Sequence, residues 1–165
     1  MSEQIPIVNE KDELLYYKER SMVTLDEIYR VSALWIENSK GQVLLAQRSF
    51  SKKQSPGKWG PAVAGTVEKG ETYESNILKE AEEEIGVSGQ IFTIAFKQRS
   101  SSDKYDKFNQ YFFLKLDWPI EQFKINENEV AKLKWFNVDD LKKELDKNPE
   151  LFVTSLNKTL TLFGK

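Results

Sequence analysis

The sequence of 165 residues contains no cysteine and no histidine. Their absence excludes catalysis by a cysteine or Ser–His nucleophile, a histidine acid–base relay, and zinc sites built on thiolate or imidazole ligands. Only carboxylates, lysine, tyrosine and water remain to move protons. The residues present therefore favour a mechanism in which a metal ion activates water and a glutamate acts as base.

The chain also lacks an apolar run of about 18 residues, a basic-then-apolar signal pattern at its N-terminus, internal repeats and low-complexity linkers. Hydrophobic residues make up 39% of it, charged residues 30%, and the formal net charge is −2. No charge excess favours a nucleic-acid partner. We expect a single globular domain over residues 1–165, located in the cytoplasm, with neither a nucleic-acid nor a membrane partner.

Three glutamates lie close together on a helix that is predicted over about residues 72–85. Glu80, Glu83 and Glu84 have the spacing i, i+3 and i+4, which places them on one helix face. Such like charges destabilise a helix by about 0.2–0.5 kcal/mol per pair unless a cation neutralises them. Carboxylate oxygens favour Mg²⁺ or Mn²⁺ over zinc. The pattern predicts a divalent-cation site, and a solvated acidic helix face is the alternative.

The residues around this cluster match a known motif. The segment of residues 65–87, GTVEKGETYESNILKEAEEEIGV, resembles the Nudix box, G-x5-E-x7-R-E-U-x-E-E-x-G-U, in which U is a bulky aliphatic residue. The positions that match are Gly65, Glu71, Glu80, Glu83, Glu84, Gly86 and Val87. Gly86 is also expected to end the helix.

Two positions depart from the Nudix box. Lys79 stands where the family has arginine, and Ala81 stands where a larger aliphatic residue is usual. Lysine keeps the charge but lacks the planar guanidinium that would hold a carboxylate with two hydrogen bonds. We therefore expect Glu80 or Glu83 to be held more loosely than in the family, and the activity to be lower.

The resemblance implies hydrolysis of a diphosphate linked to another group, with Mg²⁺ or Mn²⁺ as cofactor. The implied metal ligands and catalytic residues are the carboxylates of Glu80, Glu83 and Glu84. It also implies that the Gly65 carbonyl is a further metal ligand and that Glu71 and Lys79 support the site. An equally good interpretation of Glu71 is a carboxylate that favours the helix N-terminus.

Residues outside the box supply further candidates. An acid elsewhere often completes such sites in the family, and the candidates here are Asp103, Asp106, Glu127 and Glu129. A basic loop before the box supplies candidates for binding substrate phosphate, namely Arg48, Lys52, Lys53 and Lys58, although such a loop can also serve solubility alone. Trp59 is expected to pack in the core rather than stack on a ligand. The expected partner is a small-molecule diphosphate, by default a nucleotide derivative.

Two longer stretches, LLAQRSFSKKQSPGKWGPAVAGTVEKGE and KINENEVAKLKWFNVDDL, are similar to the isopentenyl-diphosphate isomerase-like branch of the family, and the similarity covers roughly residues 5–160. The isomerases carry a catalytic cysteine and a metal-binding histidine where this chain has Ala64 and Thr66, and a glutamate near the place of Gln110. Moving a double bond needs a proton donor and a proton acceptor, and Ala64 can be neither. We therefore favour a hydrolase over a catalytically silent ligand-binding Nudix domain, and both over an isomerase.

The resemblance also implies the fold, an α/β (α+β) Nudix sandwich with a mixed β-sheet between helices, preceded by an N-terminal β-hairpin. Residues 5–9 and 14–18 predict this hairpin, which could mediate a homodimer. The other predicted strands cover residues 28–36, 43–46, 90–98, 108–116 and 132–136, and the later helices cover residues 137–145 and 149–162. Residues 49–61 are predicted to form a loop. Leu78, Ala81 and Ile85 are expected to form the apolar stripe of the first helix.

Overall fold

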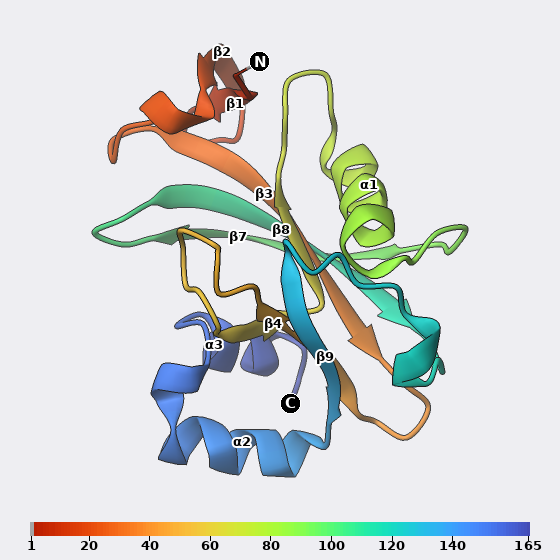
Figure 1. The fold of residues 1–165 in the computed structure, drawn as a ribbon. Coiled ribbons are helices and arrows are strands. Elements are labelled where there is room, and N and C mark those ends of the chain that lie inside the picture. Colours follow the sequence, from red (N-terminus) through yellow and green to blue (C-terminus); the bar gives the residue numbers. More distant parts are fainter. Residues whose placement is uncertain (1) are drawn as a thin grey trace.

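The computed structural model describes residues 2–165 as a mixed sheet with helices on both faces (Figure 1). The strands are β1 (Gln4–Val8), β2 (Leu14–Glu19), β3 (Ile28–Glu37), β4 (Val43–Arg48), β5 (Trp59–Pro61), β6 (Val63–Thr66), β7 (Thr93–Ser101), β8 (Asp106–Lys115) and β9 (Val130–Phe136). The α-helices are α1 (Tyr73–Ile85), α2 (Val138–Lys147) and α3 (Leu156–Leu162). The predicted α+β class with a mixed sheet is confirmed. No helix in these residues is both long and apolar enough to cross a membrane.

The central strand β3 determines where the sheet opens. It pairs in parallel with β8 and antiparallel with β1 and β6. It meets β4 at only two pairs, Ile36 with Leu44 and Glu37 with Val43, after which β4 continues with β5 and β9. Because β3 and β4 diverge after these pairs, the sheet splits into two parts with a cleft between them, which is lined by Val31 of β3 and Arg48 of β4.

Two hydrophobic cores hold the layers together. Alternate residues of β3 point to opposite faces of the sheet, so that Leu34 belongs to the core under α1 and Trp35 to the core under α2 and α3. Both side chains are fully buried. The second core includes Leu141 of α2 and Leu160 of α3. The sheet is therefore covered on both faces, as a sandwich requires.

Helix α1 begins and ends as its sequence predicts, but its apolar face differs by one residue. The Thr72 hydroxyl accepts a hydrogen bond from the Ser75 backbone N–H and so caps the N-terminus, and Gly86 ends the helix with a φ of 72°. The buried stripe consists of Ile77, Ala81 and Ile85, whereas Leu78 is 48% exposed. The prediction for Leu78 was wrong because the face of α1 that packs on the sheet includes Ile77, and Leu78 is turned from it by about 100° around the helix.

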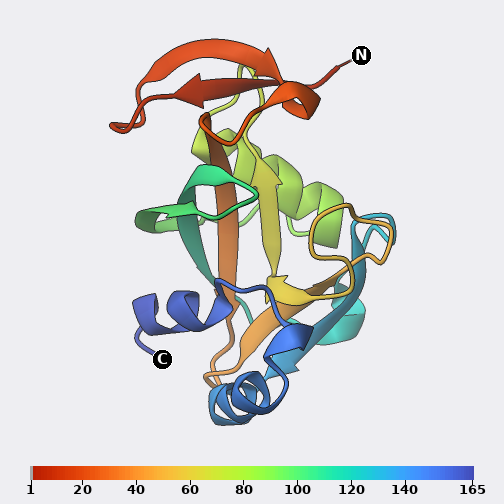
Figure 2. The same ribbon diagram turned by 90° about the vertical axis from the view of Figure 1, so that its left-hand side faces the viewer.

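The predicted N-terminal hairpin is confirmed, and it lies across the end of β3 (Figure 2). The buried carboxylate of Glu27 ties it to the body of the molecule. Lys18 Nζ donates to Glu27 Oε2 over 2.8 Å, Tyr16 Oη donates to Oε1 over 2.7 Å, and the Thr24 N–H donates to Oε2 over 2.7 Å. Burial opposes ionisation of this carboxyl, but these donors outweigh burial and lower its pKa to about 2.

We expect Glu27→Gln to lower the free energy of unfolding by about 2 kcal/mol, because it removes charge-assisted hydrogen bonds. Since the folded pKa lies below the ordinary value of 4.5, the contribution of Glu27 is present above pH 4.5 and is lost as the pH falls toward 2. Urea unfolding between pH 2 and 7 measures both effects. The control is Glu10→Gln, a substitution of an exposed glutamate. The assignment would be contradicted if the free energy of unfolding of the wild type and of Glu27→Gln had the same dependence on pH.

Two predictions of secondary structure were wrong in part. Residues 49–61 were expected to form a loop, but Trp59–Pro61 forms β5 against β4. Residues 149–162 were expected to form one helix, but a 3₁₀ turn covers Pro149–Leu151 and α3 starts only at Leu156. The break occurs because Phe152 bridges to Trp59 and the Val153 N–H donates to the Trp59 carbonyl over 2.9 Å. These contacts join segments that are far apart in sequence, so local patterns do not encode them.

Candidate active site

The cleft between β3 and β4 consists of two adjoining chambers. The acidic chamber, of about 300 Å³, contains the box residues of α1 and β6, and the inner chamber, of about 160 Å³, lies between β3, β4, β8 and the segment before α3. The residues that line both are Val31, Arg48, Lys52, Gln54, Ala64, Glu84, Lys107 and Glu129. A ligand with an anionic end and an organic end fits this division.

The acidic chamber brings together the residues that the box predicts. Glu80, Glu83 and Glu84 reach it from one face of α1, and Gly65 reaches it from β6. Glu129, which lies just before β9, joins them. The Glu129 carbonyl accepts a hydrogen bond from the Ser49 N–H over 3.0 Å, which fixes this segment against the basic loop.

Gly65 is required by the close approach of α1 to β6. A β-carbon at this position would lie 2.6 Å from Glu80 Cδ and 2.9 Å from Glu80 Oε1, and still nearer to Cγ. Such distances are far below van der Waals contact. Only glycine therefore lets the Glu80 carboxylate lie against the β6 backbone, whose Gly65 carbonyl is the other predicted oxygen ligand.

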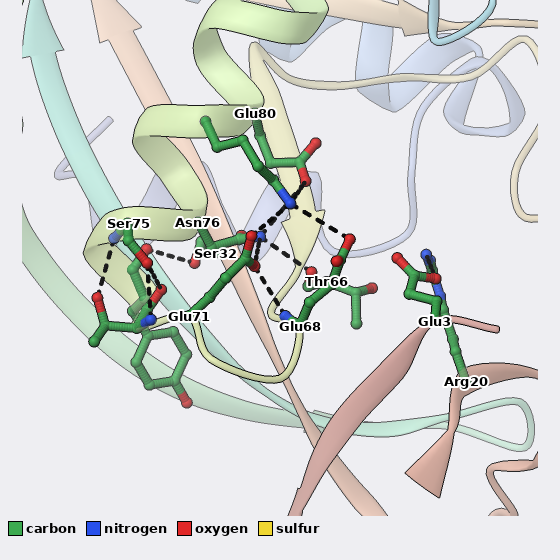
Figure 3. A network of polar contacts seen from close by, with 12 residues as sticks. Glu3, Arg20, Ser32, Thr66, Glu68, Glu71, Ser75, Asn76 and Glu80 are labelled. Atoms are coloured by element: carbon green, nitrogen blue, oxygen red, sulfur yellow. Dashed lines mark hydrogen bonds and ion pairs between the residues drawn. The ribbon is translucent and has the colours of Figure 1, made fainter. Parts of the chain in front are cut away.

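Glu71 and Lys79 form a supporting network beside this carboxylate (Figure 3). Lys79 Nζ lies 2.5 Å from Glu71 Oε1, 3.4 Å from Glu68 Oε1 and 3.6 Å from Glu80 Oε1. Glu71 Oε2 accepts a hydrogen bond from the Glu68 N–H over 2.9 Å. The lysine that replaces the family arginine thus pairs mainly with Glu71, and only its longest contact reaches Glu80.

Asn76 belongs to the same network and was not predicted from the sequence. It is fully buried on α1, and its Nδ2 donates to the Thr66 carbonyl over 3.1 Å and to Glu71 Oε2 over 2.9 Å, with Glu80 Oε1 at 3.5 Å (Figure 3). A buried amide among three acceptors connects the helix to β6 and to both carboxylates. The sequence signal was its spacing, because Asn76 stands four residues before Glu80 and therefore next to it on the helix surface.

Electrostatics separates the carboxylates into two groups. Burial, together with the charges of Glu80 and Glu129, raises the pKa of Glu84 to about 8, and burial beside Glu83 and Glu71 raises that of Glu80. Burial also opposes ionisation of Glu71, but the hydrogen bond from Lys79 and those from the Glu68 N–H and Asn76 lower its pKa. Glu71 is already neutralised by its network. Lys79 acts on Glu80, and Lys52 and Arg48 act on Glu84, but these positive charges do not outweigh burial and the neighbouring carboxylates.

This donor set fits a hard divalent cation. Its atoms are carboxylate and carbonyl oxygens, and like charges crowd together without sufficient neutralisation. Within residues 2–165, no three acidic side chains already surround a common point at which an ion would sit. Binding of a cation there would require the glutamate side chains to rotate.

Two of the four predicted phosphate-binding residues line both chambers, namely Arg48 and Lys52. Arg48 Nε donates to the Gln54 carbonyl over 2.9 Å, and Lys52 forms an ion pair with Glu129. Lys53 and Lys58 line neither chamber, although Lys53 lines an adjoining hollow that also includes Arg48 and Lys52. The basic loop therefore turns only part of its charge toward the site.

Of the acids considered outside the box, the structure brings only Glu129 to the cleft. Asp106 is occupied by Arg99, whose Nη2 lies 2.8 Å from Asp106 Oδ2. Asp103 and Glu127 are exposed and line neither chamber. The sequence could not rank these four because their distances to the box depend on how the connecting loops fold.

The three positions that differ from the isomerases lie in or near the cleft region and can be compared with its lining. Ala64 lines both chambers and Thr66 lines the acidic one, so the places of the isomerase cysteine and histidine do face the cleft. Gln110 lines neither chamber, and its Nε2 donates to the Phe96 and Tyr111 carbonyls. Trp59 packs edge to face on Phe136 at 5.3 Å and lies outside both chambers, as its predicted packing role requires.

Comparisons with known proteins agree with this geometry. A family model described as "NUDIX domain" matches residues 27–156. An isopentenyl-diphosphate Delta-isomerase of Shigella flexneri is 27% identical over 121 residues, which are 72% of this chain and 66% of the isomerase, just under two thirds of its length. A Nudix hydrolase of Deinococcus radiodurans is 29% identical over 141 residues, 84% of this chain and 81% of the hydrolase. The crystal structure of DR0079 from Deinococcus radiodurans has 26% identity and a TM-score of 0.75, covering 88% of this chain and 90% of that one.

Proposed function

This chain belongs to the Nudix family, and we propose that it is a metal-dependent hydrolase that cleaves the diphosphate linkage of a nucleoside diphosphate derivative. The observation that carries the proposal is the acidic chamber. There, the carboxylates of Glu80, Glu83 and Glu84 line the same chamber as Gly65 of β6. The cations of Arg48 and Lys52 also line this chamber. Clustered carboxylates and facing cations are the two parts that a metal-assisted diphosphate hydrolase needs.

Each residue has a definite role in this proposal. The three glutamates and the Gly65 carbonyl would hold Mg²⁺ or Mn²⁺, which supplies charge neutralisation on the phosphate oxygens and a lower pKa for the attacking water. Arg48 and Lys52 would bind the phosphate oxygens. One of the glutamates would accept the proton of the water molecule.

Phosphate release from a panel of nucleoside diphosphate and triphosphate derivatives tests the proposal. We expect turnover with Mg²⁺, its loss after chelation with EDTA, and its return when Mg²⁺ or Mn²⁺ is added. Absence of turnover across the panel, with ligand binding retained, would instead support a catalytically silent ligand-binding domain. Lys79, which replaces the family arginine, is the sequence feature that favours this alternative.

Substitution of Lys79 tests its supporting role in an active enzyme. We expect Lys79→Met to lower kcat/KM by about 10–100-fold, the usual effect of losing a residue that orients metal ligands. Lys79→Arg should raise kcat/KM, because the guanidinium can hold two carboxylates at once. The measurement is kcat/KM as a function of Mg²⁺ concentration, with exposed Lys143→Met as the charge-matched control. Equal values for all four proteins would remove the supporting role of Lys79.

Isomerisation of isopentenyl diphosphate is expected to be absent, although the chain resembles isomerases. Ala64 cannot exchange a proton, and the Gln110 amide is directed at backbone carbonyls outside the cleft. Incubation of the wild-type protein with isopentenyl diphosphate and Mg²⁺, followed by product separation, measures this. Formation of dimethylallyl diphosphate would contradict the exclusion.

A further inference from the structure

Lys107 is a mostly buried cation without an anionic partner in residues 2–165. It lies in β8 opposite Tyr29 of β3, and its Nζ is 4.3 Å from the centroid of the Tyr105 ring. Among residues 2–165 that ring is its one close electrostatic contact, and the charges that lower its pKa are Arg48 and Arg20, which are positive as well. An ammonium group in such surroundings is unfavourable unless something else compensates it.

The pKa of Lys107 agrees with this description. Burial and the repulsion from Arg48 and Arg20 lower it to about 8. At pH 7 most molecules still carry the charge, so the cleft keeps a positive group that the protein does not neutralise. An anion that enters the cleft would be attracted to Lys107, because no carboxylate in residues 2–165 forms an ion pair with it.

The position of Lys107 indicates which anion. Tyr105, Lys107, Asn109 and Tyr111 follow one another at every second position toward and along β8 and all line the inner chamber. Among them, Lys107 alone also lines the acidic chamber. It therefore lies where the two chambers meet, with Arg48 also lining both chambers from β4.

We propose that Lys107 binds the substrate phosphate that carries the organic group, so that this group lies in the inner chamber beside Asn109 and Tyr111. The inference rests on the proposed function, since it assumes a diphosphate whose other phosphate lies among the glutamates. Lysine can donate up to three hydrogen bonds, and the phosphate between the chambers offers it anionic oxygens. Lys107 thereby selects compounds with a phosphate at the junction over compounds with a neutral group there.

Binding of ADP and of inorganic pyrophosphate in the presence of Mg²⁺ tests this assignment, measured by calorimetry under conditions without turnover. Lys107→Met keeps the aliphatic stem and removes the charge, and we expect Kd for both ligands to rise by about 10–100-fold. Lys107→Arg should recover part of the loss. Lys104→Met, an exposed lysine in the preceding turn, should bind both ligands like the wild type.

Several results would overturn the assignment. Unchanged affinity of Lys107→Met for both ligands would do so, as would a wild-type chain that binds neither. A loss for ADP alone would place Lys107 against the organic group instead of the phosphate. The assignment and the proposed function fail separately: absence of hydrolysis with Lys107-dependent pyrophosphate binding removes only the function, and hydrolysis with an unchanged KM in Lys107→Met removes only the assignment.

Discussion

Replacement of Glu83 or Glu84 by glutamine is expected to lower kcat by about 10²–10⁴-fold while the protein stays folded. Glutamine has the size of glutamate, but it cannot accept a proton at neutral pH and is a weaker ligand for a divalent cation. Both side chains line the acidic chamber from the surface of α1, so neither substitution disturbs the core. For Glu84, loss of a carboxylate with a raised pKa also removes repulsion, and thermal stability without metal should rise slightly.

Glu82 provides the matched control for these two variants. It lies on the same helix, between Ala81 and Glu83, but it is exposed and lines neither chamber. Glu82→Gln changes the net charge by the same amount, and we expect it to keep wild-type kcat and KM. Steady-state kinetics at saturating Mg²⁺ gives the comparison. Equal losses in all three variants would show that helix charge matters and that the specific positions do not.

Gly65→Ala is expected to lower kcat by about 10²-fold and the free energy of unfolding by about 1–3 kcal/mol. The added methyl group would occupy the space of the Glu80 side chain, so either the carboxylate or strand β6 must move. A displacement of about 1 Å at a catalytic group is enough for a loss of this size. Enzyme kinetics and denaturant unfolding of the same preparation measure both quantities.

A double-mutant cycle distinguishes this clash from a general effect on β6. Glu80→Ala removes the Cγ, Cδ and Oε1 atoms that the new methyl group would meet. In that background, Gly65→Ala should cost little stability, although activity stays low because a ligand is missing. Equal destabilisation in the presence and absence of the Glu80 side chain would contradict the account of Gly65.

Much of the site was predictable because it is encoded locally. The spacing of Glu80, Glu83 and Glu84 depends only on the helical period, and Gly86 ends α1 through its own φ of 72°. The N-terminal hairpin and strands β3, β4, β8 and β9 likewise follow from alternating or apolar runs. The family resemblance selected the sandwich from other α+β arrangements.

The rest depends on contacts between distant segments. The loop between β4 and β5 folds onto β4 and onto the segment of Glu129, for example through the hydrogen bond from the Ser49 N–H to the Glu129 carbonyl. This folding decides which basic residues, such as Arg48 but not Lys58, line the cleft. Lys107 carries no box signal, and its importance appears only when β8 is placed beside β3. Lys107, Asn109 and Tyr111 stand at every second position, which predicts a polar face of the strand. The sequence does not show that this face lines the cleft.

The account depends most on one claim, that the acidic face of α1 holds a divalent cation. Titration with Mn²⁺, followed by the electron paramagnetic resonance signal of the free ion, measures this without knowledge of the substrate. We predict binding to the wild type and to Glu82→Gln, and at least tenfold weaker binding to a Glu83→Gln, Glu84→Gln double variant, as expected for loss of hard carboxylate ligands. Equal Mn²⁺ affinity of the double variant and the wild type would contradict the account.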